Sequence, residues 1–209
     1  MGVKKWMRRV RTEAGQALTV QLLCLGLLFV IGMLGGYLYA DYCGDHSRLV
    51  LSEYLAGYCA LYEKGTVQTV SLFAAVRLYF SYVLAALPLG FLSIGVFALP
   101  VLSGIYGFMT MFAVACFIQV YGRAGSALAM AAFGLRALFT IPCFLWVAAY
   151  AWAASSALAT RSRGKRCAPV VYDSAYFYRL LLCFVLLAIG ICAERYITPY
   201  LFQWALAKM

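Results

Sequence analysis

The sequence predicts an all-α protein, a polytopic membrane helix bundle with about five transmembrane helices. Hydrophobic residues make up 66% of the chain and charged residues 11%, with a mean hydropathy of +0.88. Soluble domains carry about 25% charged residues. The stretch from Leu78 to Gly122 contains no Asp, Glu, Lys or Arg over 45 residues. As a helix it would be about 68 Å long, whereas a bilayer core is about 30 Å thick, so we expect two crossings.

The chain is expected to form one membrane domain, residues 1–209, with spans at about 17–40, 78–99, 104–121, 137–160 and 176–195. We expect the turn of the central hairpin near residues 99–104 and a second break at 122–126. Residues 124–135 precede Arg136 and are only 12 uncharged residues long, too few to cross a bilayer. They form either a re-entrant or interfacial helix, or the first turns of a long tilted span.

Glycines recur along the predicted spans, and small residues let membrane helices approach closely. Gly32 and Gly36 form a GxxxG pair in the first span, and Gly104 and Gly107 open the third. The residues expected at helix contacts are Gly32, Gly36, Gly95, Gly104, Gly107, Phe108 and Pro142. Because a GxxxG pair can also join two copies of a chain, a homo-oligomer stays an open alternative.

Basic residues cluster at positions 1–13 and 161–166, on the same side of a five-span bundle. The positive-inside rule assigns that side to the cytoplasm. We therefore expect a multi-pass protein of the cell membrane with a cytoplasmic N-terminus. The net charge of +10 lies beside apolar segments, which indicates contacts with membrane lipids and not with nucleic acid. Arg136 is expected near the outer interface, where it can snorkel, or facing a polar interior.

Residues 41–77 form the one substantial polar region and lie outside in this topology. Apolar residues recur there at spacings of four, three and four, which predicts a helix with one apolar face. That face is either an ordinary packed surface or a contact surface for a partner protein. Its residues are Leu51, Tyr54, Leu55, Tyr58 and Tyr62. Cys43 and Cys59 share the region, and they either form a disulfide or stay free thiols.

The sequence contains no arrangement of side chains that is typical of an enzyme. Asp41, Asp45 and His46 form the only cluster of acidic and histidine residues, which we interpret as a solvated turn and not a cation site. Walker, GxGxxG and HExxH motifs are absent from the sequence. We predict that the protein is not an enzyme and uses no cofactor or metal.

The order of these features resembles the stage II sporulation protein M family. Local similarity covers about residues 70–160. It includes LGFLSIG at 89–95, SGIYGF at 103–108, YGRAG at 121–125 and IP at 141–142. The sequence departs from the family pattern at two places. Ser103 stands where the family often has a basic residue, just before the glycine that matches Gly104. Arg136 is the only polar group at 133–138, where the family often has a polar patch.

The resemblance implies a non-enzymatic scaffold that recruits and positions peptidoglycan-remodelling enzymes during engulfment in sporulation. Its implied partners are similar to stage II sporulation proteins D and P, which are membrane-anchored peptidoglycan hydrolases. A shared scaffold would raise their effective concentration. The alternative is a permease-like membrane subunit of a transporter, which predicts a polar cavity between helices broken at Pro88 and Pro142.

Overall fold

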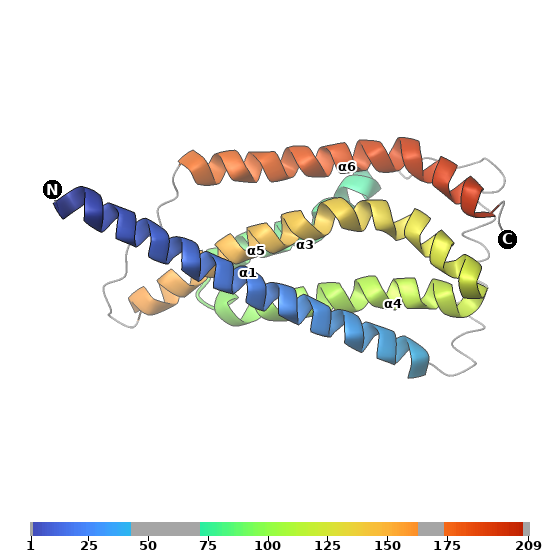
Figure 1. Ribbon diagram of the computed structural model, residues 1–209, viewed down its shortest axis with the longest axis horizontal. Helices are drawn as coiled ribbons and strands as arrows, with labels where there is room; N and C mark the ends of the chain where they lie inside the picture. Colours follow the sequence, from blue (N-terminus) through green and yellow to red (C-terminus); the bar gives the residue numbers. More distant parts are fainter. Residues whose placement is uncertain (1, 43–71, 163–173, 207–209) are drawn as a thin grey trace.

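The computed structural model describes residues 2–42, 72–162 and 174–206, and every regular element among them is a helix (Figure 1). The elements are α1 (Gly2–Tyr42), α3 (Leu72–Gly90), α4 (Gly95–Ala129), the π-helix η1 (Met130–Gly134), α5 (Leu135–Ser162) and α6 (Ser174–Leu206). Within these residues, four stretches are long and apolar enough to cross a membrane, namely Ala17–Tyr42, Gly95–Gly122, Leu135–Thr160 and Leu180–Ile197. The predicted fold class, an all-α membrane helix bundle, is confirmed.

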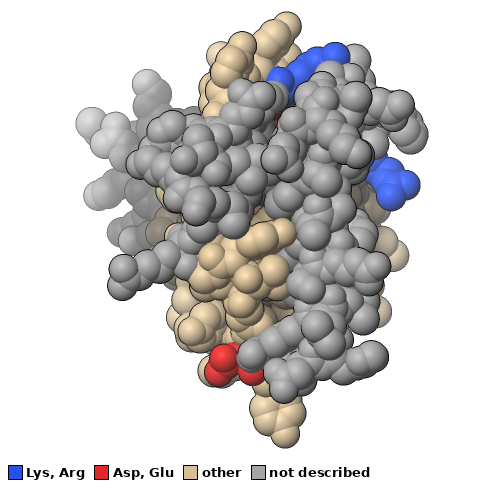
Figure 2. Space-filling model, turned by 90° about the vertical axis from the view of Figure 1, so that its right-hand side faces the viewer, with Lys and Arg blue, Asp and Glu red and all other residues tan. Residues whose placement is uncertain are grey.

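Successive helices run in alternating directions along the bundle (Figure 1). The start of α1, the end of α5 and the start of α6 lie at one end, and α1 projects beyond its neighbours there. The end of α1, the start of α3 and the end of α6 lie at the other. The helix ends that adjoin the two basic clusters of the sequence therefore share one end. At the opposite end, the few described charged side chains lie toward its margins (Figure 2).

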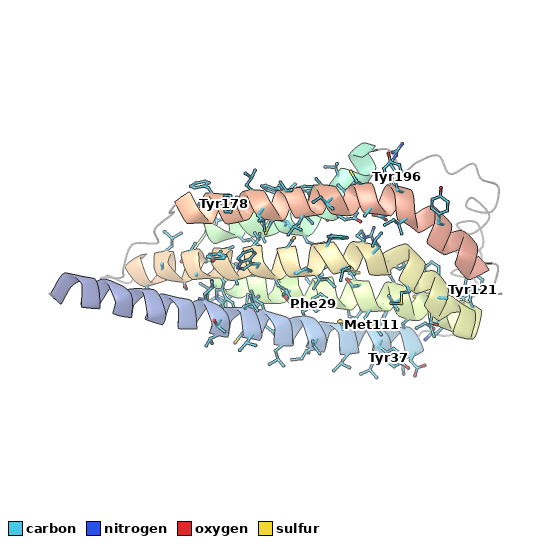
Figure 3. All side chains as sticks on the ribbon, turned by 45° about the horizontal axis from the view of Figure 1, so that its top comes forward. Phe29, Tyr37, Met111, Tyr121, Tyr178 and Tyr196 are labelled. Atoms are coloured by element: carbon cyan, nitrogen blue, oxygen red, sulfur yellow. The ribbon has the colours of Figure 1, made fainter. Side chains whose placement is uncertain are left out.

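Exposed tyrosines mark both ends of the apolar helices (Figure 3). Tyr178 lies near the start of α6 and Tyr196 near its end, 68% and 71% exposed. They are 18 residues apart, about 27 Å along a helix, close to the thickness of a hydrocarbon core. The exposed Tyr37 and the half-buried Tyr121 lie near the ends of the apolar spans of α1 and α4, at the same end as Tyr196. This placement is typical of side chains at a membrane interface.

The central hairpin turns earlier than the sequence predicts. The expected turn at residues 99–104 is wrong, because α3 ends at Gly90, residues 91–94 form the turn, and Pro100 lies inside α4. The span predicted at 78–99 is thus replaced by α3, whose described apolar part, Tyr79–Gly90, is 12 residues long. A proline inside a membrane helix is tolerated when neighbouring groups satisfy the freed backbone atoms.

Close packing explains why the turn forms at 91–94. A β-carbon at Gly95 would overlap the carbonyl oxygen of Leu89, and one at Gly90 would press on Ala151 of α5 at 3.0 Å. The hydroxyl of Ser155, fully buried, donates a 2.6 Å hydrogen bond to the Leu92 carbonyl. The turn is therefore held against α5 by two glycines and one buried serine.

The chain reverses at Gly122, as the predicted break at 122–126 requires. Gly122 has φ 59° and ψ −132°, a conformation that is free of strain only for glycine. Gly125 then packs directly on the carbonyl of Phe117, and the rings of Phe117 and Phe133 meet edge to face at 5.6 Å. Residues 124–135 are continuous in backbone with η1 and α5. Of the two alternatives, the structure favours the first turns of a long span.

Helices α4 and α5 form the centre of the described bundle, since each contacts every other described α-helix. The largest fully buried side chains come from all five described α-helices and include Leu25, Tyr79, Leu99, Phe144 and Leu187. The outward faces are also apolar, with Leu27, Val101 and Leu181 each about 60% exposed. Such a surface suits contact with lipid tails and not with water.

Candidate functional site

The predicted packing glycines lie mainly where α1 and α4 run side by side in the same direction (Figure 1). A β-carbon at Gly32 would overlap the backbone of Gly104, and one at Gly36 would overlap the backbone of Phe108. Gly107 approaches the backbone of α1 just as closely. The two helices therefore touch through their main chains, an arrangement that only small residues permit.

Polar and aromatic contacts fix the register of α1 on α4. The buried hydroxyl of Ser103 donates a 2.9 Å hydrogen bond to the carbonyl oxygen of Leu25. Nearer the end of α1, the Tyr39 ring lies 5.8 Å and 5.9 Å from the rings of Phe108 and Phe112. Gly104 differs from the other glycines, since a β-carbon there would meet only the Leu28 carbonyl, at 3.8 Å.

The remaining predicted residues are not part of the α1–α4 contact. Gly95 packs in the turn between α3 and α4, and Pro142 is exposed on α5. The predicted partner-contact face lies outside the described residues, as do both cysteines of the predicted disulfide; these residues are Leu51, Tyr54, Leu55, Tyr58, Tyr62, Cys43 and Cys59.

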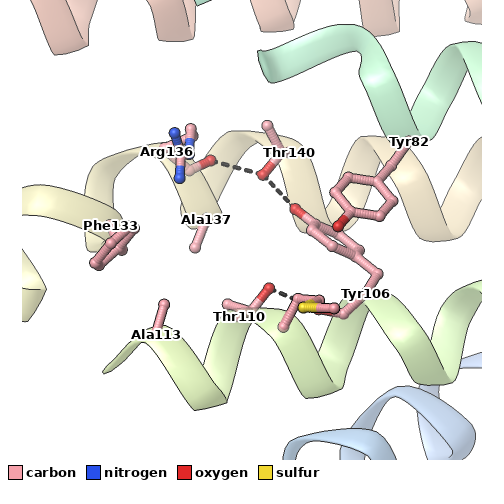
Figure 4. A pocket seen from close by; sticks show the side chains of 9 residues that line it. Tyr82, Tyr106, Thr110, Ala113, Phe133, Arg136, Ala137 and Thr140 are labelled. Atoms are coloured by element: carbon pink, nitrogen blue, oxygen red, sulfur yellow. Dashed lines mark hydrogen bonds between the residues drawn. The ribbon is translucent and has the colours of Figure 1, made fainter. Parts of the chain in front are cut away.

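The structure adds a site that the sequence did not reveal, a cavity of about 150 Å³ between α3, α4, η1 and α5 (Figure 4). It is lined by Tyr82, Tyr106, Met109, Thr110, Ala113, Phe133, Arg136, Ala137 and Thr140. An engineered protein cavity of about 150 Å³ is large enough to bind benzene. The wall combines hydroxyl groups from three helices with one cation, which is unusual inside an apolar bundle.

A chain of hydrogen bonds runs along the wall of the cavity (Figure 4). The Thr140 hydroxyl donates to the carbonyl oxygen of Arg136 at 2.9 Å. The Tyr106 hydroxyl therefore donates to Thr140, at 2.7 Å. Thr110 donates to the Tyr106 carbonyl at 2.8 Å. Tyr82 stacks on Tyr106 with ring centroids 4.1 Å apart. The Tyr106 side chain is thus fixed by a hydrogen bond at its hydroxyl and by stacking at its ring.

Arg136 lines the cavity from the first turn of α5, two residues after the π-helical turn Met130–Gly134 ends. Its guanidinium lies 5.5 Å from the centroid of the Phe133 ring, within range of a cation–π interaction. A π turn holds one extra residue and rotates the residues after it by about 100° relative to a regular α-helix. It thus decides which side chain of α5 faces α4. π-Helical turns occur frequently at functional sites.

The cavity lies near the middle of the α4 span and not at its end. Met109 and Ala113 line it, and they precede Tyr121 by 12 and 8 residues, or about 12–18 Å of helix. Of the two positions expected for Arg136, the structure favours the polar interior over the interface. No group of three or more His, Cys, Asp and Glu that could hold a metal ion is found within the described part of the chain.

Comparison with protein-family models, with curated proteins and with solved structures finds no match to this chain. The resemblance to the stage II sporulation protein M family therefore stays a prediction from the residues. The structure itself establishes a multi-pass, all-α membrane helix bundle with a close α1–α4 contact and an arginine-bearing cavity.

Proposed function

We propose that this chain is a non-enzymatic membrane scaffold that holds partner proteins in position at the bilayer. The observation that carries the proposal is the main-chain contact between α1 and α4 through Gly32, Gly36 and Gly107. Because the backbones touch at these glycines, sliding one helix along the other would bring the larger neighbouring side chains against the facing backbone. The end of α1, which leads into residues 43–71, is thereby fixed to the centre of the bundle.

The partners that fit this proposal are membrane-anchored peptidoglycan hydrolases, as the family resemblance implies. Residues 43–71 contain the apolar face predicted for partner contact, and the helices on either side of this segment adjoin it at the same end of the bundle (Figure 1). A partner already confined to the membrane gains a high effective concentration at such a surface. Modest contacts then suffice for recruitment.

Co-purification tests the scaffold. The protein is co-expressed with one membrane-anchored peptidoglycan hydrolase and recovered from mild detergent. We expect the hydrolase to be recovered with the wild type and at least fivefold less with Leu55→Glu plus Tyr58→Glu. The matched control, Ala56→Glu plus Ala60→Glu, adds the same charge on the opposite side of the predicted helix. Equal recovery with all three proteins would contradict the docking role.

The cavity favours a second candidate, a permease-like subunit of a transporter. A transport pathway requires that water reach the cavity from one side of the membrane in some state of the protein. A cysteine placed at Ala137, in a chain without other cysteines, reports on this. Modification by a charged, membrane-impermeant thiol reagent at the rate of a surface cysteine would support transport. Protection in vesicles from both sides would leave the scaffold as the better account.

A further inference from the structure

The wall of the cavity carries a positive charge, and no acidic residue is among the side chains that line it. Arg136 supplies a guanidinium, and the other eight lining residues are neutral. A guanidinium offers five N–H donors and no acceptor, so it pairs well with carboxylate or phosphate oxygens. Arg136 is half-buried within an apolar bundle, where a charged side chain is costly unless it is paired or reaches water. The wall is therefore suited to an anion.

Three of the four hydroxyl groups of the wall already donate within the protein, and the fourth belongs to Tyr82. Thr140 donates its proton to the Arg136 carbonyl, Tyr106 donates to Thr140, and Thr110 donates to the Tyr106 carbonyl. All three protons are thus used within the protein. Recognition of an anion consequently depends on the Arg136 side chain, with the Tyr82 hydroxyl as a further donor. The bond between Tyr106 and Thr140 joins α4 to α5 beside the cavity.

The cavity reaches the exposed face of α4 at Met109. Met109 lines the cavity and is 52% exposed. It continues a row of exposed apolar side chains on α4, Val101 and Ile105, at spacings of four residues. Such a row contacts acyl chains in a bilayer. A ligand that enters beside Met109 therefore comes from the membrane, with its apolar tail left outside.

We propose that the cavity binds the oxyanion, carboxylate or phosphate, of an anionic amphiphile from the surrounding bilayer, with Arg136 as its counter-ion. A volume of about 150 Å³ admits one such group. Among the described residues the competing counter-ion is Glu194 of α6, since both Glu194 and Arg136 act electrostatically on Tyr79. Glu194 does not line the cavity. This inference does not depend on the proposed scaffold function.

Binding to the full-length protein in phosphatidylcholine nanodiscs tests the proposal, with radiolabelled oleate and phosphatidic acid as the two amphiphiles. We expect saturable binding of one equivalent of at least one of them. Arg136→Gln should weaken it at least tenfold, and Ala113→Leu, which fills the cavity but keeps the charge, should do the same. Arg195→Gln removes an exposed arginine of α6 and should leave the affinity unchanged. Arg136→Lys should retain binding to within about threefold.

Four results would overturn the proposal. The first is equal affinity in the wild type, Arg136→Gln and Ala113→Leu. The second is the absence of saturable binding to the folded wild type. The third is binding that appears only in Glu194→Gln, which would show that Glu194 already neutralises Arg136. The fourth is displacement of the amphiphile by millimolar acetate or inorganic phosphate, which would assign the site to a free anion and not to a lipid.

Discussion

Helix α4 presents two different faces to its neighbours. Toward α1 it is dry and tight, with glycines that bring main chains into contact. Toward η1 and α5 it is loose and polar, with hydroxyl groups, an arginine and an unfilled volume. The first face is closely packed and stabilises the fold, while the second is less closely packed and contains a cavity. Substitutions should therefore be costly on the first face and tolerated on the second.

The largest effect is expected at Gly32. Its β-carbon in Gly32→Ala would overlap the Gly104 backbone, which has no flexible side chain to move away. We expect a loss of about 3 kcal/mol in the free energy of unfolding, at the upper end of the range for overpacking. Unfolding from mild detergent by titration with sodium dodecyl sulfate measures it. Gly26→Ala is the matched control, because nothing lies within 4 Å of its added carbon. A loss as large in the control would show that α1 does not pack as described.

A pair of alanines on α4 contrasts the two faces directly. Ala115 is 1% exposed in the core, whereas Ala113 borders the cavity. Ala115→Leu should lower the free energy of unfolding by about 2 kcal/mol through overpacking, while Ala113→Leu should change it by less than about 1 kcal/mol. The same titration compares them. The contrast between the faces is lost if Ala113→Leu proves the more destabilising.

A loss smaller than those of Gly32→Ala and Ala115→Leu is expected at Gly122, where the chain reverses. There is open space around its β-carbon position, so only the backbone conformation, φ 59°, opposes a side chain. Gly122→Ala should cost about 1–2 kcal/mol, and Gly122→Asn less, because asparagine tolerates left-handed conformations better than other residues. The apparent midpoint of thermal unfolding in detergent ranks the three proteins. Wild-type stability in Gly122→Ala would mean that the chain turns elsewhere.

Composition and charge spacing sufficed to predict the fold class, because the bilayer selects strongly for long apolar helices. The break at Gly122 was also predictable, since glycines flank a charged residue there. The turn at 91–94 was not, because Pro100 and Gly104 looked like stronger breaks than Gly90 and Gly95. The choice between them depends on contacts with Ala151 and Ser155, more than 50 residues away in the sequence.

The cavity could not be predicted from the sequence for a related reason. A π turn at 130–134 has no local signature, and it changes which side chains of the following helix face Thr110 and Ala113. Arg136 was expected either near the outer interface or facing a polar interior, and the neighbouring residues do not favour one position over the other. Only the position of α4 opposite α5 indicates that its surroundings are a polar interior.

Direct contact between the α1 and α4 backbones is the feature on which the scaffold account depends most. Disulfide cross-linking in a chain without native cysteines tests it most directly. Residue 28 of α1 lies beside Gly104 of α4, because the Leu28 carbonyl oxygen is 3.8 Å from the β-carbon position of Gly104. Cysteines at these two positions should cross-link under mild oxidation. Cysteines at Leu27 and Gly104 should not, because Leu27 is 63% exposed on the outer face of α1. Equal cross-linking of both pairs, or of the second pair alone, would contradict the account.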